Sequence, residues 1–194
     1  MAQGYRRVVG IDEAGRGSWA GPVVAACLLF DPSIKRLPGI SDSKLLTAKQ
    51  RDNFFVWLAG SFSYGVGIIS SKIIDKHGIV AATKLAMAEA VNKLKIKPDF
   101  LLIDAVKLDI VEVEQKSLIR GDQKVWSIAA ASIIAKVIRD RLMTDYGKQY
   151  ENYGFDRHKG YGTKLHQDKL AERGICPIHR KSYTPIREIV DVKI

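Results

Sequence analysis

The chain of 194 residues contains little cysteine and no long apolar run. Its two cysteines, Cys27 and Cys176, have no paired spacing, which excludes a disulfide-stapled scaffold and fits a reducing compartment. The longest apolar stretch, residues 126–135, is too short to span a bilayer. Only a very short apolar segment follows the charged N-terminus, so we expect no signal peptide and a cytoplasmic protein without membrane contact.

Internal repeats, low-complexity tracts and long linkers are also absent. This absence and the length predict a single domain over residues 1–194, with about residues 175–194 as a short C-terminal extension. His158, His166 and His179 show no zinc-like spacing with cysteine, so we expect them to bond backbone or phosphate. No heptad seam is visible, and we expect a monomer.

Acidic residues are too few to balance the basic ones. The chain has 21 aspartates and glutamates against 31 lysines and arginines, which gives a formal net charge of +10. Residues 157–194 alone carry nine bases against four acids. Such an excess favours a polyanionic partner, with nucleic acid as the first candidate, although a solvated basic surface is the simpler alternative.

Apolar patterning predicts an α/β fold with a mixed β-sheet flanked by helices. We expect strands at residues 8–11, 22–30, 63–69, 100–103 and 117–119. We expect helices at residues 48–59, 80–94, 124–146 and 163–173. The short, glycine-rich connection after the first strand predicts that the first two strands are antiparallel. The third helix is apolar or small on every side at its centre, which is typical of a buried helix.

Carboxylates follow two of the predicted strands. Asp12 and Glu13 come at the end of the first strand, and Asp104 ends the short apolar strand at residues 100–103. If these strands are neighbours, their carboxylates emerge at one rim of the sheet. Carboxylates are hard ligands that suit Mg²⁺ or Mn²⁺. Buried like charges repel one another unless a cation neutralises them, so the pattern predicts a divalent metal site.

The sequence leaves two questions about this acidic group open. Asp122 precedes the buried helix, where it either caps that helix or joins the other acids at the metal. Asp12 and Glu13 are consecutive, and consecutive side chains in a regular strand point to opposite faces. We therefore expect the strand to end or bulge at these residues, with the glycines that follow providing the freedom.

Phosphate-binding elements lie next to the acids in sequence. Gly15 and Gly17 allow the backbone to approach a ligand closely, and Arg16 between them is suited to a phosphate. Ser43 and Lys44 follow a loop and precede a helix, which is a natural phosphate-binding position. A polar start to a helix is the alternative interpretation of that pair.

Taken together, these residues resemble the ribonuclease HII family, the type 2 RNase H enzymes. The resemblance extends from about residue 9 to residue 188, and seven blocks in one order could hardly arise by chance. The blocks are residues 10–17 with 20–23, 42–44, 103–104, 121–122, 127–140, 158–163 and 179–183. Ser18 and Trp19 stand where family members often have proline and a smaller apolar residue, which changes packing behind the turn but touches no carboxylate.

The resemblance implies an RNase H-like fold with a short C-terminal helical extension. It implies an endonuclease that hydrolyses the RNA strand of RNA–DNA hybrids. It also implies cutting on the 5′ side of a single ribonucleotide embedded in duplex DNA, with 3′-hydroxyl and 5′-phosphate ends. The acids that match the family's metal ligands for Mn²⁺ or Mg²⁺ are Asp12, Glu13, Asp104 and Asp122.

Two further elements gain a role from the resemblance. The turn of Gly15, Arg16 and Gly17 matches the element that reads the ribose 2′-hydroxyl, the group that distinguishes RNA from DNA. Tyr161 matches a tyrosine that stacks on the sugar next to the ribonucleotide and detects the RNA-to-DNA junction. The alternative for Tyr161 is a core aromatic, but its flanking glycines make burial less favourable.

Other functions remain as alternatives. The sister enzyme ribonuclease HIII usually carries an added N-terminal domain, which we do not expect with the first acid at residue 12. Another two-metal nuclease of the same fold would lack the Gly-Arg-Gly and Gly-Tyr-Gly blocks. A non-enzymatic, basic nucleic-acid-binding protein would not need four acids, which repel phosphate in the absence of metal. No clamp-binding peptide is evident at the C-terminus.

Overall fold

Five strands form one mixed sheet in the order β3-β2-β1-β4-β5. A computed structural model describes residues 4–40 and 43–191, so Asp42 and Lys193 lie outside the described residues. The strands are β1 (Val8–Ala14), β2 (Val23–Leu29), β3 (Tyr64–Ile69), β4 (Phe100–Asp104) and β5 (Gln115–Leu118). As expected, β1 and β2 are antiparallel; β4 instead pairs with β1 in parallel, with Ile11 opposite Ile103.

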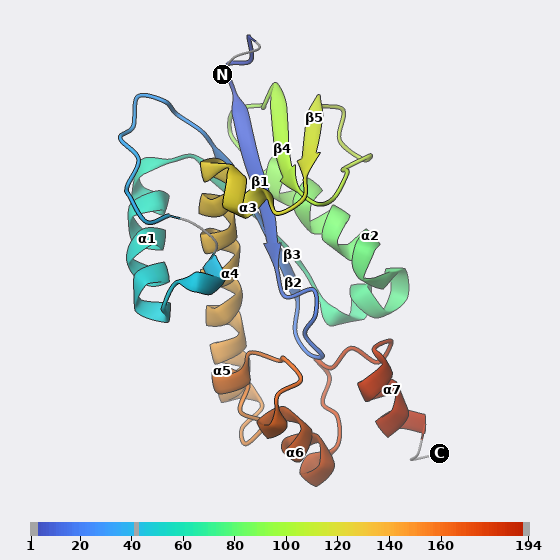
Figure 1. Cartoon of the computed structure of the whole chain (residues 1–194). Helices are drawn as coiled ribbons and strands as arrows, with labels where there is room; N and C mark the ends of the chain where they lie inside the picture. Colours follow the sequence, from blue (N-terminus) through green and yellow to red (C-terminus); the bar gives the residue numbers. More distant parts are fainter. Residues whose placement is uncertain (1–3, 41–42, 192–194) are drawn as a thin grey trace.

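Helices cover both faces of this sheet (Figure 1). The helical elements are η1 (Ser43–Leu45), α1 (Ala48–Ser61), α2 (Ser71–Asn92), α3 (Gly121–Lys124), α4 (Trp126–Gln149), α5 (Phe155–His158), α6 (Lys164–Arg173) and α7 (Thr184–Asp191). The α2 helix packs on one face, whereas α1 and α4 pack on the other. Figure 1 shows α5, α6 and α7 gathered beyond one end of the sheet.

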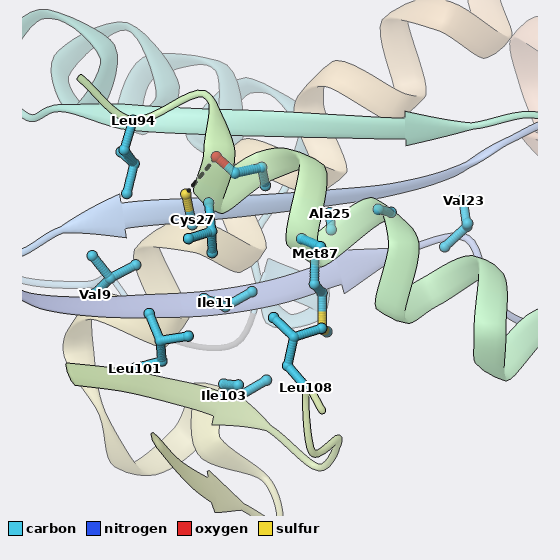
Figure 2. Packing of buried hydrophobic residues seen from close by; sticks show 14 of the residues in the cluster. Val9, Ile11, Val23, Ala25, Cys27, Met87, Leu94, Leu101, Ile103 and Leu108 are labelled. Atoms are coloured by element: carbon cyan, nitrogen blue, oxygen red, sulfur yellow. Dashed lines mark hydrogen bonds between the residues drawn. The ribbon is translucent and has the colours of Figure 1, made fainter. Parts of the chain in front are cut away.

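The core on the α2 face consists of the odd-numbered side chains of β1 and β4. Figure 2 shows Val9 and Ile11 beside Leu101 and Ile103, with Met87 of α2 packed over them. The thiol of Cys27 is also buried here, where its Sγ donates to the carbonyl of Ala90 at 3.2 Å. Burial raises the pKa of this thiol to about 12, so it stays protonated, as expected for a structural cysteine.

The even-numbered residues of the same two strands face α4. This alternation places Asp12 and Asp104 on one face, because they follow Gly10 and Leu102, which are partners across the two strands. The α4 helix runs along β1, and its serine Ser132 hydrogen-bonds Asp12. The fold therefore brings the two strand-end acids together with a long buried helix.

Most of the expected elements are confirmed. Thr47 caps α1, and its reciprocal hydrogen bonds with Gln50 form a capping box. Thr163 caps α6, which ends at Gly174. The expected helix at residues 80–94 is too short, because α2 begins at Ser71. Gly78 has φ 78° and ψ 160° inside this helix, and that kink divides the apolar pattern into two parts.

The C-terminal segment ends in a single short helix, α7. It follows a loop in which Arg180 and Ile178 contact residues of the β1–β2 connection. Among the described residues, no helix is long and apolar enough to cross a membrane. The expectation of a short helical extension is confirmed, and its contacts with the β1–β2 connection tie it to the end of the sheet where the acids lie.

Candidate active site

A hollow of about 300 Å³ opens where β1 and β4 end. It is lined by residues from five separate parts of the chain, and nine of the ten predicted site residues are among them. These nine are Asp12, Glu13, Gly15, Arg16, Gly17, Ser43, Lys44, Asp104 and Tyr161. The remaining lining residues are Ala14, Ser132 and Lys136. The structure therefore brings nine of the ten predicted residues together at one place.

The strand geometry explains how consecutive acids share one hollow. The expectation that β1 ends or bulges at the acids is wrong, because β1 continues to Ala14 with Asp12 opposite Ala26 and Glu13 opposite Ala25. It is the pairing with the neighbouring strand β4 that ends, because β1 pairs with β4 only as far as Ile11. Beyond that point the edge of β1 is open, so both acids border the space that β4 leaves.

Burial destabilises the charge on Asp12 and Glu13. Asp12 is 5% exposed, and burial followed by the repulsion of Glu13 raises its pKa well above the usual value. Burial also raises the pKa of Glu13, and the guanidinium of Arg16 opposes that rise. Arg16 Nη1 lies 3.3 Å from Glu13 Oε1, whereas Glu13 Oε2 is buried without a hydrogen-bond partner within the described residues.

The α3 helix connects Asp104 with Asp122. The amide of Gly121 donates to Asp104 Oδ1 at 2.7 Å, and Asp122 follows in the same short helix, 7% exposed. Asp122 is the one predicted residue that does not line the hollow. Asp122 does not occupy the N-cap position of the buried helix, because the residue before α4 is Val125.

The Gly-Arg-Gly turn needs its two glycines for different reasons. Gly15 has φ +94°, and a Cβ there would lie 2.0 Å from Arg139 Nε, so any other residue would be strained and would clash. Gly17 faces open space, with no atom within 4 Å of a built Cβ. Close approach of a ligand to the backbone is therefore possible at Gly17, while Gly15 is fixed by the protein behind it.

Ser43 and Lys44 both line the hollow but differ in environment. Ser43 is 3% exposed and its hydroxyl lies 2.8 Å from that of Ser132, so it joins η1 to α4, whereas Lys44 is exposed.

Two lining residues of the hollow, Ser132 and Lys136, were not predicted from the sequence. Their spacing of four, continued by Asp140, places polar groups on one side of an otherwise apolar helix, and this signal could have revealed them. Lys136 donates to Asp140 at 2.7 Å.

Tyr161 forms the wall opposite the acids. Its ring is half-buried, with Arg139 and Lys136 at 5.3 Å and 5.6 Å from the ring centroid. Its amide donates to the carbonyl of His158, and the adjacent Gly160 carbonyl accepts from Trp19 at 2.8 Å. Two cations thus contact the ring, and backbone hydrogen bonds fix the segment that carries it. Part of the half-buried ring stays available to a ligand.

Comparison with known proteins identifies this arrangement. The family model for ribonuclease HII matches residues 9–186, nearly the whole chain. The chain belongs to the ribonuclease HII family. A ribonuclease HII of Listeria monocytogenes is 52% identical over 187 residues, which cover 96% of this chain and 71% of that protein. One of Chloroflexus aurantiacus is 47% identical over 191 residues, 96% of this chain and 90% of that protein.

Solved structures confirm the RNase H-like fold. Ribonuclease H2 of Pyrococcus horikoshii has a TM-score of 0.82 at 30% identity and covers 96% of this chain and 98% of its own. The Archaeoglobus fulgidus ribonuclease HII, solved in complex with PCNA, has a TM-score of 0.80 at 26% identity, with coverages of 92% and 96%. As a ribonuclease HII, the chain is a metal-dependent endonuclease of the ribonuclease H type and acts on nucleic acid.

The donor groups at the hollow fit the divalent metal that ribonuclease HII requires. Glu13 Oε2 is buried without a hydrogen-bond partner among the described residues, and the buried Asp12 lies beside it, so both residues offer carboxylate oxygens of the kind that a divalent cation binds. Within residues 4–40 and 43–191, no three acidic, histidine or cysteine side chains lie together as a ready-made metal site. Instead the carboxylates have protein partners: Arg16 for Glu13 and the Gly121 amide for Asp104.

Two buried arginines, Arg139 and Arg180, hold the loop that carries the Gly-Arg-Gly turn. Both are 0% exposed, and no carboxylate forms an ion pair with either in the described part of the chain. Arg180 donates to four carbonyls of this loop, those of Gly15, Arg16, Gly21 and Pro22. Arg139 donates to Pro22, Ala20 and the Ser18 hydroxyl. The turn at residues 15–17 is therefore held in shape by side chains buried inside the protein.

Replacing Arg180 with alanine should remove this support. It would remove four hydrogen bonds to buried carbonyls and leave that of Gly21 without a donor among the described residues, and we expect the free energy of unfolding to fall by about 3–5 kcal/mol. Arg180→Lys keeps the charge but not the planar fork, so it should recover only part of that loss. Urea unfolding measures both effects, with the exposed Arg187→Ala as the control. Equal stability of the Arg180→Ala and control variants would contradict this role.

Three histidines form a neutral cluster beneath Tyr161. His158 and His166 stack with ring centroids 4.2 Å apart, and His166 Nε2 lies 3.0 Å from His179 Nε2. The other contacts are with backbone: Tyr153 and Gly160 for His158, Tyr161 for His166, and Cys176 for His179. The expected backbone bonds are confirmed. Each ring is satisfied with one proton, and for His158 and His166 a second proton would replace an acceptor by a second donor.

This cluster should make the protein less stable in mild acid. Burial lowers the pKa of His166 to about 3 and that of His179 to about 4, both below the usual 6.5. Between pH 7 and pH 5 the unfolded chain binds protons that the folded chain does not. The contribution of these two histidines to the free energy of unfolding should therefore fall by about 2–4 kcal/mol over this range. The raised pKa values of Asp12 and Glu13 act in the opposite direction. Urea unfolding of an Asp12→Asn/Glu13→Gln variant at both pH values removes that opposing effect, and constant stability there would contradict the prediction.

Proposed function

We propose that the hollow cuts the RNA strand of RNA–DNA hybrids and cuts 5′ of single ribonucleotides embedded in duplex DNA. Its products would carry 3′-hydroxyl and 5′-phosphate ends. One observation supports this most strongly: the acids, the Gly-Arg-Gly turn and Tyr161 line the same small hollow. A site that combines metal ligands, an exposed backbone turn and a half-buried ring can recognise a ribonucleotide and its scissile phosphate together.

The proposed metal ligands are Asp12, Glu13, Asp104 and Asp122, for two Mn²⁺ or Mg²⁺ ions. Bound there, two ions supply an activated water and stabilise the leaving 3′-oxygen. The chain's own groups prepare the site. Burial keeps Asp12 and Glu13 poorly solvated, which strengthens their attraction for a cation. Arg16 contacts Oε1 of Glu13 and would partly neutralise this carboxylate before a metal ion binds, while Oε2 remains free of this contact.

The turn at residues 15–17 would recognise the ribose. The 2′-hydroxyl is both donor and acceptor, so it can bond to backbone amides and carbonyls. The open space beside Gly17 gives it access. Arg180 and Arg139 hold the turn in place, so that its groups need not reorganise when the ribose arrives.

Phosphates would be bound by the exposed cations around the hollow. Lys44 and Arg16 border it, and Lys136 lies behind Tyr161. In this proposal Ser43 positions η1 through Ser132, so that its backbone rather than its hydroxyl meets a phosphate. Tyr161 would stack on the deoxyribose next to the ribonucleotide, where an added hydroxyl is crowded. The nine bases after residue 156 extend the positive surface for duplex binding.

We propose that the enzyme acts as a monomer in the cytoplasm and forms one catalytic unit. The bonds from Arg180 to the β1–β2 connection support treating residues 175–194 as part of that unit. The two free, buried thiols, Cys27 and Cys176, are compatible with a reducing compartment.

A labelled DNA duplex that contains one ribonucleotide tests the proposal. The enzyme is incubated with it in Mn²⁺, Mg²⁺ or EDTA. We expect one metal-dependent cut on the 5′ side of the ribonucleotide. Cutting only in long hybrids would reject the junction specificity but keep the metal site. Binding without cutting on either substrate would favour the non-enzymatic alternative.

A further inference from the structure

A second hollow, of about 580 Å³, lies on the α4 face of the sheet at the starts of β1 and β4. Val8, Phe100 and Leu102 form its floor, and Val8 and Phe100 are partners across the two strands. It shares no lining residue with the catalytic hollow. Asp12 is four residues further along β1 than Val8, which corresponds to about 13 Å along an extended strand.

Aromatic rings form the sides of this second hollow. Tyr5 stacks on Phe100 with ring centroids 4.3 Å apart and an interplanar angle of 29°. Phe30 meets Trp126 edge-on, with centroids 6.0 Å apart. All four rings are half-buried, so each leaves part of its surface exposed to the hollow. Two aromatic pairs that border one space can accept a flat, unsaturated ring.

Positive charge surrounds the same space. Arg36, Lys116 and Lys124 line it and are exposed, and no acidic residue lines it. Glu114, which hydrogen-bonds Tyr5, and Asp99 are the acids nearest that ring. The first residues of the 24-residue helix α4 also line the hollow. The three cations together favour an anion.

We propose that this second hollow binds a nucleotide, with the base against the aromatic rings and the phosphate at the cations. Aromatic surface alone would suit any apolar ring, and cations alone would suit any anion, but a nucleotide combines both. The volume lies within the range of about 300–1,000 Å³ that small-molecule sites occupy. The same chemistry belongs to a free nucleoside phosphate and to an unpaired nucleotide at a strand end.

Calorimetric titration in EDTA tests the proposal without cleavage. The probes are AMP, inorganic phosphate and a 5′-phosphorylated tetrathymidylate. The pocket variant Arg36→Glu/Lys116→Glu should weaken AMP binding about tenfold or more. The matched control, Lys95→Glu/Lys97→Glu, changes the net charge equally on the loop after α2 and should stay within about twofold of the unchanged protein. Tighter binding of the tetranucleotide than of AMP would assign the site to a strand end, and the reverse to a free nucleotide.

A second variant separates base from phosphate recognition. Tyr5→Leu removes a ring but no charge, so it should weaken AMP binding several-fold and leave phosphate binding unchanged. No saturable binding of AMP or of the tetranucleotide, equal weakening by the pocket and control variants, or equal loss of AMP and phosphate in Tyr5→Leu would overturn the proposal. Cutting at an embedded ribonucleotide should persist in the pocket variant, so failure of the nuclease proposal would be seen separately.

Discussion

Asp12→Asn should abolish metal-dependent hydrolysis and at the same time stabilise the protein. An amide is a poor ligand for a divalent ion, so we expect the cutting rate to fall by about 10³-fold or more. The buried Asp12 carboxyl has a raised pKa, and ionising it at neutral pH therefore opposes folding. The neutral amide removes that opposition, so the free energy of unfolding in the absence of metal should increase.

Two measurements on one variant check this prediction. Single-turnover cutting of the embedded-ribonucleotide duplex reports activity, and urea unfolding in EDTA reports stability. Substrate binding, measured by fluorescence anisotropy, should remain. Asp145→Asn is a matched control, because the exposed Asp145 pairs with Lys148 and neither residue lines the hollow. Retained hydrolysis in Asp12→Asn would contradict the assignment of Asp12 as a metal ligand. A loss of stability would contradict the expectation that the buried carboxylate opposes folding.

Tyr161→Ala should damage cutting at a single ribonucleotide more than cutting within a long hybrid. The ring is held over Arg139 and borders the catalytic hollow, so its removal leaves the junction sugar without a surface to stack on. We expect a loss of about ten- to a hundredfold at the junction, the scale of a misplaced reacting group. In the proposed binding mode, the neighbouring ribonucleotides of a long hybrid would not need this contact.

The ratio of the two cutting rates is the informative quantity. Tyr161→Phe keeps the ring and its contact with Arg139, and it should preserve the ratio. Parallel measurements on both substrates, at saturating metal, distinguish junction reading from a general loss of structure. Equal losses on both substrates in Tyr161→Ala would reject the junction role.

Much of the fold was predictable because local signals agree with it. Four of the five strands are short apolar runs, the polar β5 being the exception, and Thr47 and Thr163 begin their helices with recognisable caps. The start of α2 was missed, because Gly78 interrupts its apolar pattern. Which strands pair was harder to predict from the sequence. The parallel contact of β1 with β4 joins residues about 90 apart, and no local pattern specifies it.

The candidate site was predictable to a similar degree. Acids at strand ends and a turn between glycines are visible in the sequence, and nine predicted residues meet at one hollow. The residues that support them were not visible. Arg139 and Arg180 have the residue type of a solvated surface, yet both are fully buried. Ser43 matched a phosphate-binding position, but its hydroxyl hydrogen-bonds Ser132.

The long sequence separation between Arg180 and the turn has a consequence for biosynthesis. The carbonyls of Gly15 and Arg16 each receive a hydrogen bond from a residue more than 160 positions later, although Gly15 also accepts one from the nearby Ser18. On the ribosome, the β1–β2 connection therefore emerges long before the guanidinium that fixes it. A nascent chain can form the sheet first, but the turn at residues 15–17 gains its final shape only after residue 180 has left the exit tunnel.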